Sequence, residues 1–176
     1  MIRELATVDL AQRLSEGQSR ETTQAIVAYI GDDPTRFAAL FKLLQCGDFR
    51  MQQCAAWPIS VVAEDNPQLV EPYLAKLLVY LKRDDVHDAV KRSVVRLLQY
   101  VDIPKRRRGE VFALCADLLD DPSETVAVRA FALTVAERIA GENEELKNEL
   151  RLILRKHLPQ ATAAMRVRSR RLLSGR

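Results

Sequence analysis

Three arginines recur at a fixed step along this chain of 176 residues. Arg92, Arg129 and Arg166 lie 37 residues apart, and Arg92 stands two residues before the apolar residue Val94. On a helix this spacing is a rotation of about 200°, so these guanidinium groups would point away from the apolar side. Positive groups in a row attract phosphates or the acidic surface of a protein. This arginine column is therefore the first candidate for a binding surface.

Three further arginines extend the candidate set. Arg96 and Arg170 follow one helical turn after members of the column, on the same side. Arg168 occupies, in the last copy of the 37-residue step, the position that Val94 and Phe131 occupy earlier, so solvent or a partner should lie there. The predicted partner-binding residues are Arg92, Arg96, Arg129, Arg166, Arg168 and Arg170.

The C-terminal part of the chain is strongly basic. Residues 150–176 hold 8 Lys or Arg and no Asp or Glu, whereas the whole chain has a net charge of +3. A second cluster, Lys105–Arg108, begins a predicted helix, which is the end where the helix dipole disfavours positive charge. An acidic protein or a nucleic acid would bind such clusters, although a solvated end face would have the same composition. Aromatic residues make up only 6% of the chain, so few side chains could stack on bases.

Other kinds of chemistry find no support in the sequence. His87 and His157 have no second histidine or cysteine at the spacing of a metal site. The 3 cysteines form no C-x-x-C pair, and the 6 glycines form no phosphate-binding loop. The pairs Asp84–Asp85 and Asp120–Asp121 are expected to cap helices. We therefore predict a protein that is not an enzyme and has no catalytic residue, metal or cofactor.

Composition favours a helical protein of the cytoplasm. Hydrophobic residues make up 48% of the chain, with only 6 Gly and 7 Pro, as helices joined by short turns require. No apolar run approaches the roughly 20 residues that span a bilayer, and Met1–Glu4 does not begin a signal peptide. An odd number of cysteines, 3, favours free thiols in a reducing compartment.

The elements that must position the arginines are amphipathic helices in a repeat. Apolar residues at Phe37, Leu40, Phe41 and Leu44 follow the spacing of one helix face, and apolar residues recur 37 and 74 positions later. A second set carries Trp57 to Val94 and Phe131 at the same step. Two amphipathic helices per period are typical of a stacked helical-repeat array.

Turn residues divide this array. We predict an N-terminal helix pair within residues 1–30, followed by repeats at 31–66, 67–103, 104–141 and 142–176, all within one domain of about 10 helices. The predicted helices are 2–15, 18–30, 34–46, 48–65, 67–82, 85–101, 105–120, 123–140, 143–157 and 161–174.

The third repeat resembles the HEAT family of helical repeats. Its segment 121–132 reads Asp-Pro-Ser-Glu-Thr-Val-Ala-Val-Arg-Ala-Phe-Ala, which is similar to that family's turn Asp-Pro followed by Val-Arg-x-x-Ala. Segments 90–95 and 164–167 echo the motif, whereas the first repeat has Ala55 where the others have arginine. The resemblance covers roughly residues 31–174.

This resemblance implies a right-handed all-α superhelix of antiparallel helix pairs, with the second helices on a concave surface. It implies a scaffold or adaptor that binds a protein partner there. In similar repeats the column arginine often bonds a turn aspartate or carbonyl, so a structural ladder and a ligand-facing stripe both remain open. One branch of similar folds excises damaged bases from DNA. The tryptophan-and-aspartate pocket expected of such an enzyme is not found, because the chain has one tryptophan, Trp57.

The repeat register also predicts which positions are buried. Leu77, Leu98 and Phe131 should be core residues between stacked helices, and Trp57 should join them. Ala55 should tolerate arginine, because its column faces outward in the other repeats. Pro58 lies inside a predicted helix and should kink it, because proline lacks the N–H that the helix needs.

Overall fold

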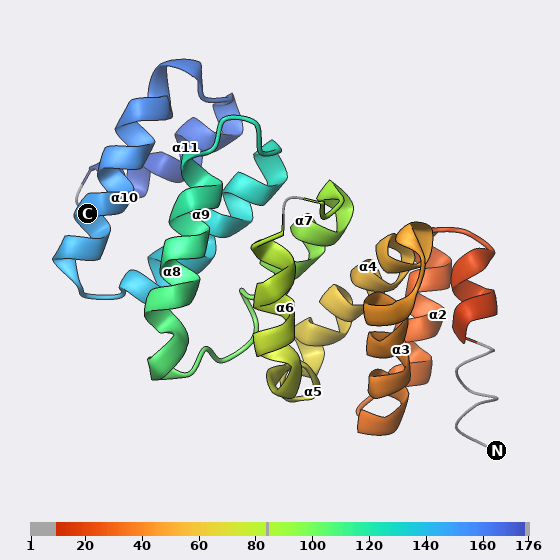
Figure 1. The fold of residues 1–176 in the computed structure, drawn as a ribbon. Helices are drawn as coiled ribbons and strands as arrows, with labels where there is room; N and C mark the ends of the chain where they lie inside the picture. The colour runs from red at the N-terminus through yellow and green to blue at the C-terminus, as the bar shows by residue number, and fades with distance from the viewer. Residues whose placement is uncertain (1–9, 84, 175–176) are drawn as a thin grey trace. The chain divides into compact units, whose positions relative to one another are not determined.

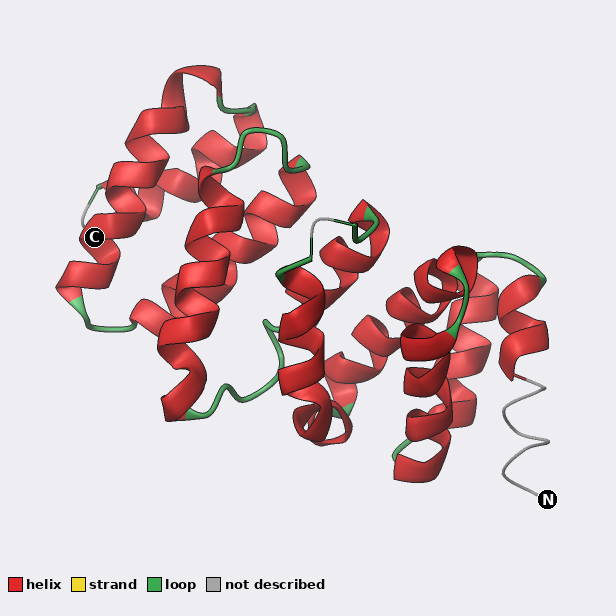
Figure 2. Cartoon of the chain, viewed as in Figure 1, coloured by secondary structure: helices red, strands yellow, loops and turns green. Residues whose placement is uncertain are grey.

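The computed structural model describes residues 10–83 and 85–174, and these are helical without any strand (Figure 2). Contacts divide the chain into two compact units, Met1–Asp102 and Ile103–Arg176, which are described separately here as unit 1 and unit 2. The prediction of an all-α protein of about 10 helices is confirmed, since ten α-helices, α2 to α11, are bounded within the described residues. The right-handed superhelix and the single domain stay predictions.

Unit 1 contains the N-terminal helices and the first two repeats (Figure 1). Residues 10–15 are helical. The elements that follow are α2 (Arg20–Ile30), α3 (Pro34–Cys46), α4 (Phe49–Asp65), α5 (Pro67–Val70), the 3-10 turn η1 (Glu71–Tyr73), α6 (Leu74–Leu81) and α7 (Asp88–Leu97).

Polar side chains cap the first three bounded helices of unit 1. Ser19, Asp33 and Asp48 each accept a hydrogen bond from a backbone N–H in the first turn of α2, α3 and α4. Such caps satisfy donors that have no partner inside the helix. The start of α7 differs from expectation, because His87, and not Asp85, caps it through Nδ1.

Two predicted helices of the second repeat are shorter than expected. The segment 67–82 is divided into α5, η1 and α6, and Pro72 lies in the 3-10 turn that separates the two α-helices. Proline lacks an N–H and its ring clashes with the carbonyl four residues earlier, so it interrupts a regular α-helix. The helix predicted for 85–101 extends only over Asp88–Leu97.

The core of unit 1 surrounds α4, which packs against α2, α3, α5 and α7. The predicted apolar face of α3 (Phe37, Leu40, Phe41 and Leu44) is 0% exposed. The Tyr80 hydroxyl ties the second repeat to the first by donating to the carbonyl oxygen of Leu44 at 2.9 Å. The helix continues through Pro58, which is buried, and the hydroxyl of Ser60 donates to the Trp57 carbonyl beside it.

Unit 2 contains the last two repeats. Its elements are α8 (Lys105–Asp120), α9 (Val126–Ala140), α10 (Glu144–His157), the 3-10 turn η2 (Leu158–Gln160) and α11 (Ala163–Leu173). Thr125, Asn143 and Thr162 cap α9, α10 and α11. Helix α9 packs on α8, α10 and α11, so the core lies between the two repeats.

Burial corrects the predicted register at three positions. Ala55 is 0% exposed, so the expectation that it faces outward, and with it the reason to expect that it tolerates arginine, is wrong. The reason is that α4 has neighbouring helices on several sides, whereas the prediction assumed one outward face. Trp57 and Phe131 are half-buried and not core residues, while Leu77 and Leu98 are 0% exposed as predicted.

Candidate partner-binding surface

Arg96 connects α7 to α4, which are the second helices of the second and the first repeat. From α7 its guanidinium donates to the backbone oxygen of Ser60 at 3.2 Å and to the Ser60 hydroxyl at 3.3 Å, both on α4. It also forms an ion pair with Glu64 and lies over the ring of Tyr100. With its side chain only 26% exposed, Arg96 holds α7 to α4. These contacts give Arg96 the structural role, one of the two roles that the sequence left open for such arginines.

Arg92 has a different position on the same helix. Its side chain is exposed, and within residues 10–83 and 85–174 no carboxylate or other hydrogen-bond acceptor pairs with it. The structure therefore separates two arginines that the sequence placed on one side of α7. Arg92 is available to a partner, whereas Arg96 is used within unit 1.

Arg129 stabilises the turn of the third repeat. It is half-buried in the first turn of α9, and its Nε donates to the carbonyl oxygen of Leu119 at 3.0 Å. Leu119 lies in the last turn of α8, where carbonyl groups lack partners inside the helix. The bond thus closes the end of α8 onto the start of α9.

Arg166, in the same register, also donates to a backbone oxygen but stays exposed. Its Nε donates to the carbonyl oxygen of Ala161, in the turn before α11, at 2.8 Å. One side of the guanidinium is thereby fixed, and the rest of the group faces outward. Arg166 is therefore bonded to the turn before α11 and exposed at the same time.

Arg168 reaches from α11 back to α9. Its Nη1 donates to the carbonyl oxygen of Ala130 at 2.9 Å and to the Thr134 hydroxyl at 3.2 Å. The residue is nevertheless exposed, so these bonds hold it against α9 without burying it. Thr134 occupies the register position of Ser60, two 37-residue steps later, and both hydroxyls accept from an arginine of the following repeat.

Arg170 is exposed on α11 and lines an open hollow of about 640 Å³. We call this site the arginine hollow, and its lining residues are Arg155, Leu158, Pro159, Arg166, Arg170, Leu173 and Ser174. Arg155, an exposed residue of α10, was predicted only as part of the basic C-terminal end. The structure thus brings Arg166 and Arg170 together with Arg155.

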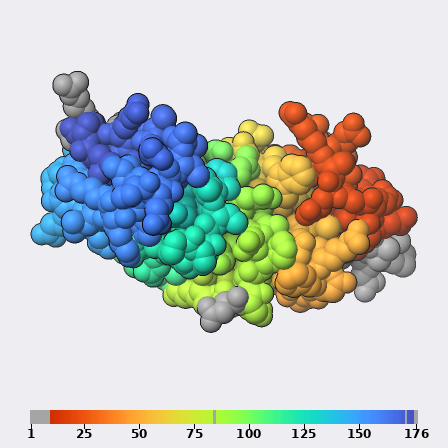
Figure 3. Space-filling model, turned by 90° about the horizontal axis from the view of Figure 1, so that it is seen from above, coloured from red at the N-terminus to blue at the C-terminus, as the bar shows by residue number. Residues whose placement is uncertain are grey.

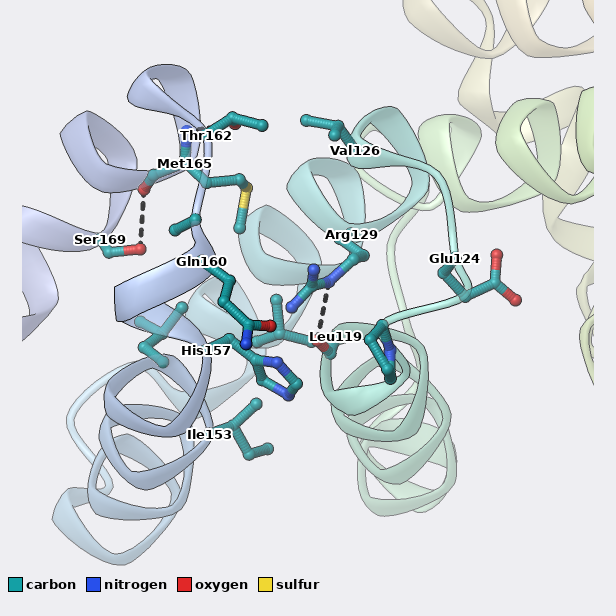
Figure 4. Close-up of a pocket in the computed structure, with 13 residues that line it drawn as sticks. Leu119, Glu124, Val126, Arg129, Ile153, His157, Gln160, Thr162, Met165 and Ser169 are labelled. Atoms are coloured by element: carbon teal, nitrogen blue, oxygen red, sulfur yellow. Dashed lines mark hydrogen bonds between the residues drawn. The ribbon is translucent and has the colours of Figure 1, made fainter.

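A smaller pocket of about 140 Å³ lies between the third and fourth repeats (Figure 4). The close-up shows the side chains of Arg129, His157, Gln160 and Met165 extending toward this space from α9, α10, η2 and α11. Its apolar lining comes from Leu119, Pro122 and Val126 of the third repeat and from residues 153–165 of the fourth. Because Arg129 is held on the Leu119 carbonyl, one wall of the pocket is fixed by a hydrogen bond.

An ion cluster beside this pocket was not predicted. Asp120 accepts two hydrogen bonds from Lys156 Nζ, both at 2.8 Å, and its Oδ1 lies 2.7 Å from His157 Nε2. These hydrogen bonds, first that of Lys156 and then that of His157, hold the pKa of Asp120 below its ordinary value. Asp120 was predicted as a cap, but it ends α8 and links it to α10. The separation of 37 residues between Asp120 and His157 is the signal that could have revealed the pair.

The described residues contain no group of three or more His, Cys, Asp or Glu that could hold a metal ion. Cys54 and Cys115 are buried and Cys46 is exposed, each as a free cysteine. Burial raises the pKa of the Cys115 thiol to about 12, so this thiol stays protonated at neutral pH. Among residues 10–83 and 85–174, no helix combines the length and the apolar character needed to cross a membrane.

The comparison with protein families is consistent with this geometry. A family model described as HEAT repeat domain matches residues 10–175, nearly the whole chain. The chain belongs to the HEAT repeat family. The resemblance seen in the segment 121–132 therefore extends to the N-terminal helices, beyond the range of roughly 31–174 expected from the sequence. Comparisons of this HEAT repeat protein with curated proteins and with solved structures give no significant match.

Proposed function

We propose that this HEAT repeat protein is a non-enzymatic scaffold or adaptor that binds a protein partner through arginines of its second helices. HEAT repeat domains are helical scaffolds that typically mediate protein interactions. The proposal goes further, because it assigns the partner-facing role to Arg92 in unit 1 and to Arg166, Arg168 and Arg170 in unit 2.

One observation carries this proposal: the positive charge of the last repeat is only partly neutralised. Arg151 pairs with Glu144, and Lys156 pairs with Asp120. In contrast, no carboxylate within the described ranges 10–83 and 85–174 pairs with four arginines of α10 and α11, namely Arg155, Arg166, Arg168 and Arg170. Uncompensated charge on a surface increases the rate and specificity of association with an oppositely charged partner.

Recovery of a complex tests the proposal. The full chain, carrying an affinity tag, is used to capture partners from a nuclease-treated lysate, and the captured protein is then purified and mixed with the chain. A stoichiometric complex in size-exclusion chromatography with light scattering supports the scaffold function. Capture of nucleic acid alone, or of no stoichiometric protein, contradicts it.

Charge reversal then locates the surface. Arg92→Glu and Arg170→Glu should each weaken the complex with the purified partner, because both side chains are exposed. Arg20→Glu is the matched control: Arg20 is also exposed, and the substitution causes the same change in charge at the start of α2. Equal affinities for all three variants would remove these arginines from the interface.

The uncompensated arginines also favour nucleic acid as a second candidate. Binding through phosphates releases counterions, so log K should fall with log salt by about 0.9 for each duplex phosphate neutralised. A gel-shift series in increasing salt measures this slope. No binding of duplex or single-stranded DNA at low salt would exclude the candidate.

A further inference from the structure

The arginine hollow is formed where the chain turns between α10 and α11. Pro159 stands in η2, the 3-10 turn after α10, and α11 begins three residues after that turn ends. Arg166 and Arg170 are four residues apart on α11, so they lie on one side of the helix. Arg155 belongs to the last turn of α10 and lines the same hollow. Three arginines therefore line one open space of about 640 Å³.

This arrangement does not favour the stability of α11. Like charges four residues apart destabilise a helix by a few tenths of a kcal/mol, and positive charge near a helix N-terminus opposes the helix dipole. The first turn of α11 has no acidic residue, and no Asp or Glu occurs in 150–176 to offset the arginines locally. An anionic ligand in the hollow would reverse both effects, because it would bring negative charge between Arg166 and Arg170.

The rest of the lining indicates what kind of anion fits. Leu158, Pro159 and Leu173 contribute an apolar surface beside the guanidinium groups, and no acidic or aromatic residue is part of the lining. Single-stranded nucleic acid is usually held by aromatic side chains that stack on its bases, and these are missing from the hollow. A peptide with both carboxylates and an aliphatic side chain matches both parts of the lining.

We infer, on the basis of the proposed function, that the arginine hollow binds an acidic segment of a protein partner. Carboxylates of that segment pair with Arg155, Arg166 and Arg170, and an aliphatic side chain packs on Leu158, Pro159 and Leu173. Arginine suits this role because its planar group makes two parallel hydrogen bonds to one carboxylate. In Figure 3 the last repeat, in blue, covers much of the visible surface of unit 2.

A peptide titration on the full chain tests this inference. The probe is a short fluorescein-labelled peptide with aspartate and glutamate on both sides of a central leucine, followed by fluorescence anisotropy. A second peptide has asparagine and glutamine in place of the acids, and a third has serine in place of the leucine. We expect the acidic peptide to bind at least about tenfold more tightly than the amide peptide, because charged hydrogen bonds contribute about 1.5–3 kcal/mol each. The serine peptide should bind more weakly than the leucine peptide.

Two double variants with the same loss of charge locate the site. Arg155→Gln/Arg170→Gln should weaken binding of the acidic peptide by about tenfold or more. It leaves Arg166 and its bond to Ala161 intact, so thermal unfolding should resemble that of the wild type. Arg20→Gln/Lys42→Gln, which removes two exposed charges from α2 and α3, should bind as the wild type does.

The outcomes separate the hollow from the scaffold function. Equal affinity in both double variants, or equal binding of the acidic and amide peptides, overturns the inference even if a stoichiometric protein complex has been found. A single-stranded DNA of matched charge that displaces the acidic peptide and binds more tightly also overturns it, in favour of nucleic acid. If neither the peptide nor any protein partner binds, the proposed function and the inference both fail.

Discussion

Helices α4 and α11 are the second helices of the first and the last repeat, yet their surroundings differ. Helix α4 is buried along much of its length, from Cys54 to Ala63, and packs on four other helices. Helix α11 has only Met165 and Ser169 buried among its described side chains, and most of the others are exposed. Ala55 in α4 and Arg166 in α11 occupy the same position of the repeat. The position is buried in α4 and holds a small residue, whereas it is exposed in α11 and holds a charged one.

The turns of the first and third repeats also differ. Residues 47–48 suffice to join α3 to α4, whereas residues 121–125 join α8 to α9. The last carbonyl groups of a helix have no partner inside that helix. Arg129 donates to such an oxygen, that of Leu119 near the end of α8, and Arg166 donates to the oxygen of Ala161, in the turn before α11. The same register position therefore holds a buried alanine in the first repeat and an arginine bonded to the backbone in the third and fourth.

The largest effect on stability is expected when the buried position in α4 receives the arginine that α11 has there. Ala55→Arg would place a charge at a site that is 0% exposed, and we expect a loss of stability of about 3–5 kcal/mol. Ala164→Arg, at an exposed position of α11, should change stability by less than about 0.5 kcal/mol. Urea unfolding followed by circular dichroism measures both. Similar values for the two variants would show that α4 is less enclosed than the structure indicates.

Truncation of core leucines should have the next largest effect. Leu77→Ala and Leu98→Ala remove side chains that are 0% exposed, so each should cost about 2–5 kcal/mol. Leu152→Ala is the control, because that side chain is 66% exposed on α10 and should cost under about 0.5 kcal/mol. Denaturant midpoints of the three variants give the comparison, and a small loss at both Leu77 and Leu98 would refute the packing of unit 1.

The arginines of α7 provide a smaller contrast within one helix. Arg96→Ala should cost about 1–2 kcal/mol, because it removes the donor to Ser60 and leaves Glu64 without its partner. Arg92→Ala should stay within about 0.5 kcal/mol, as for most exposed residues. Thermal unfolding of the two variants decides: equal shifts would mean that the bridge from α7 to α4 contributes little.

The sequence predicted the helices well because their signals are local. Pro34 and Asp48 mark helix starts through backbone chemistry that needs no distant neighbour. The helix expected from residue 123 instead begins at Val126, after the cap Thr125. The 37-residue step also predicted the buried face of α3, since every repeat must bury one stripe against the next, but it misplaced Trp57 and Phe131 in the second helices. The hydrogen-bond partner and the exposure of a polar side chain were harder to predict, because they depend on which acceptors the fold places near it.

Arg96 and Arg170 illustrate this limit. They are two 37-residue steps apart and look equivalent in the sequence, but Arg96 finds Ser60 and Glu64, whereas Arg170 borders an open hollow. The hollow is also lined by Arg155, which lies on α10 and belongs to no predicted column. Composition alone identified the basic C-terminal end, and only the turn at Pro159 shows which of its arginines converge.

The smallest expected effect concerns the cluster that joins α8 to α10. The pKa of Asp120 is lowered by the hydrogen bonds of Lys156 and then of His157, so the stability that these contacts contribute is present above the carboxyl's unfolded pKa of about 3.9. This contribution is lost as the pH falls through the lower folded-state pKa. Asp120→Asn should therefore reduce stability near pH 7, by under about 1 kcal/mol for so exposed a pair, and the difference from wild type should shrink in acid as the Asp120 carboxyl becomes protonated. Asp117→Asn, on the same helix and exposed, is the control for the change in charge. Urea unfolding across this pH range would refute the assignment if the Asp120 and Asp117 variants behaved alike.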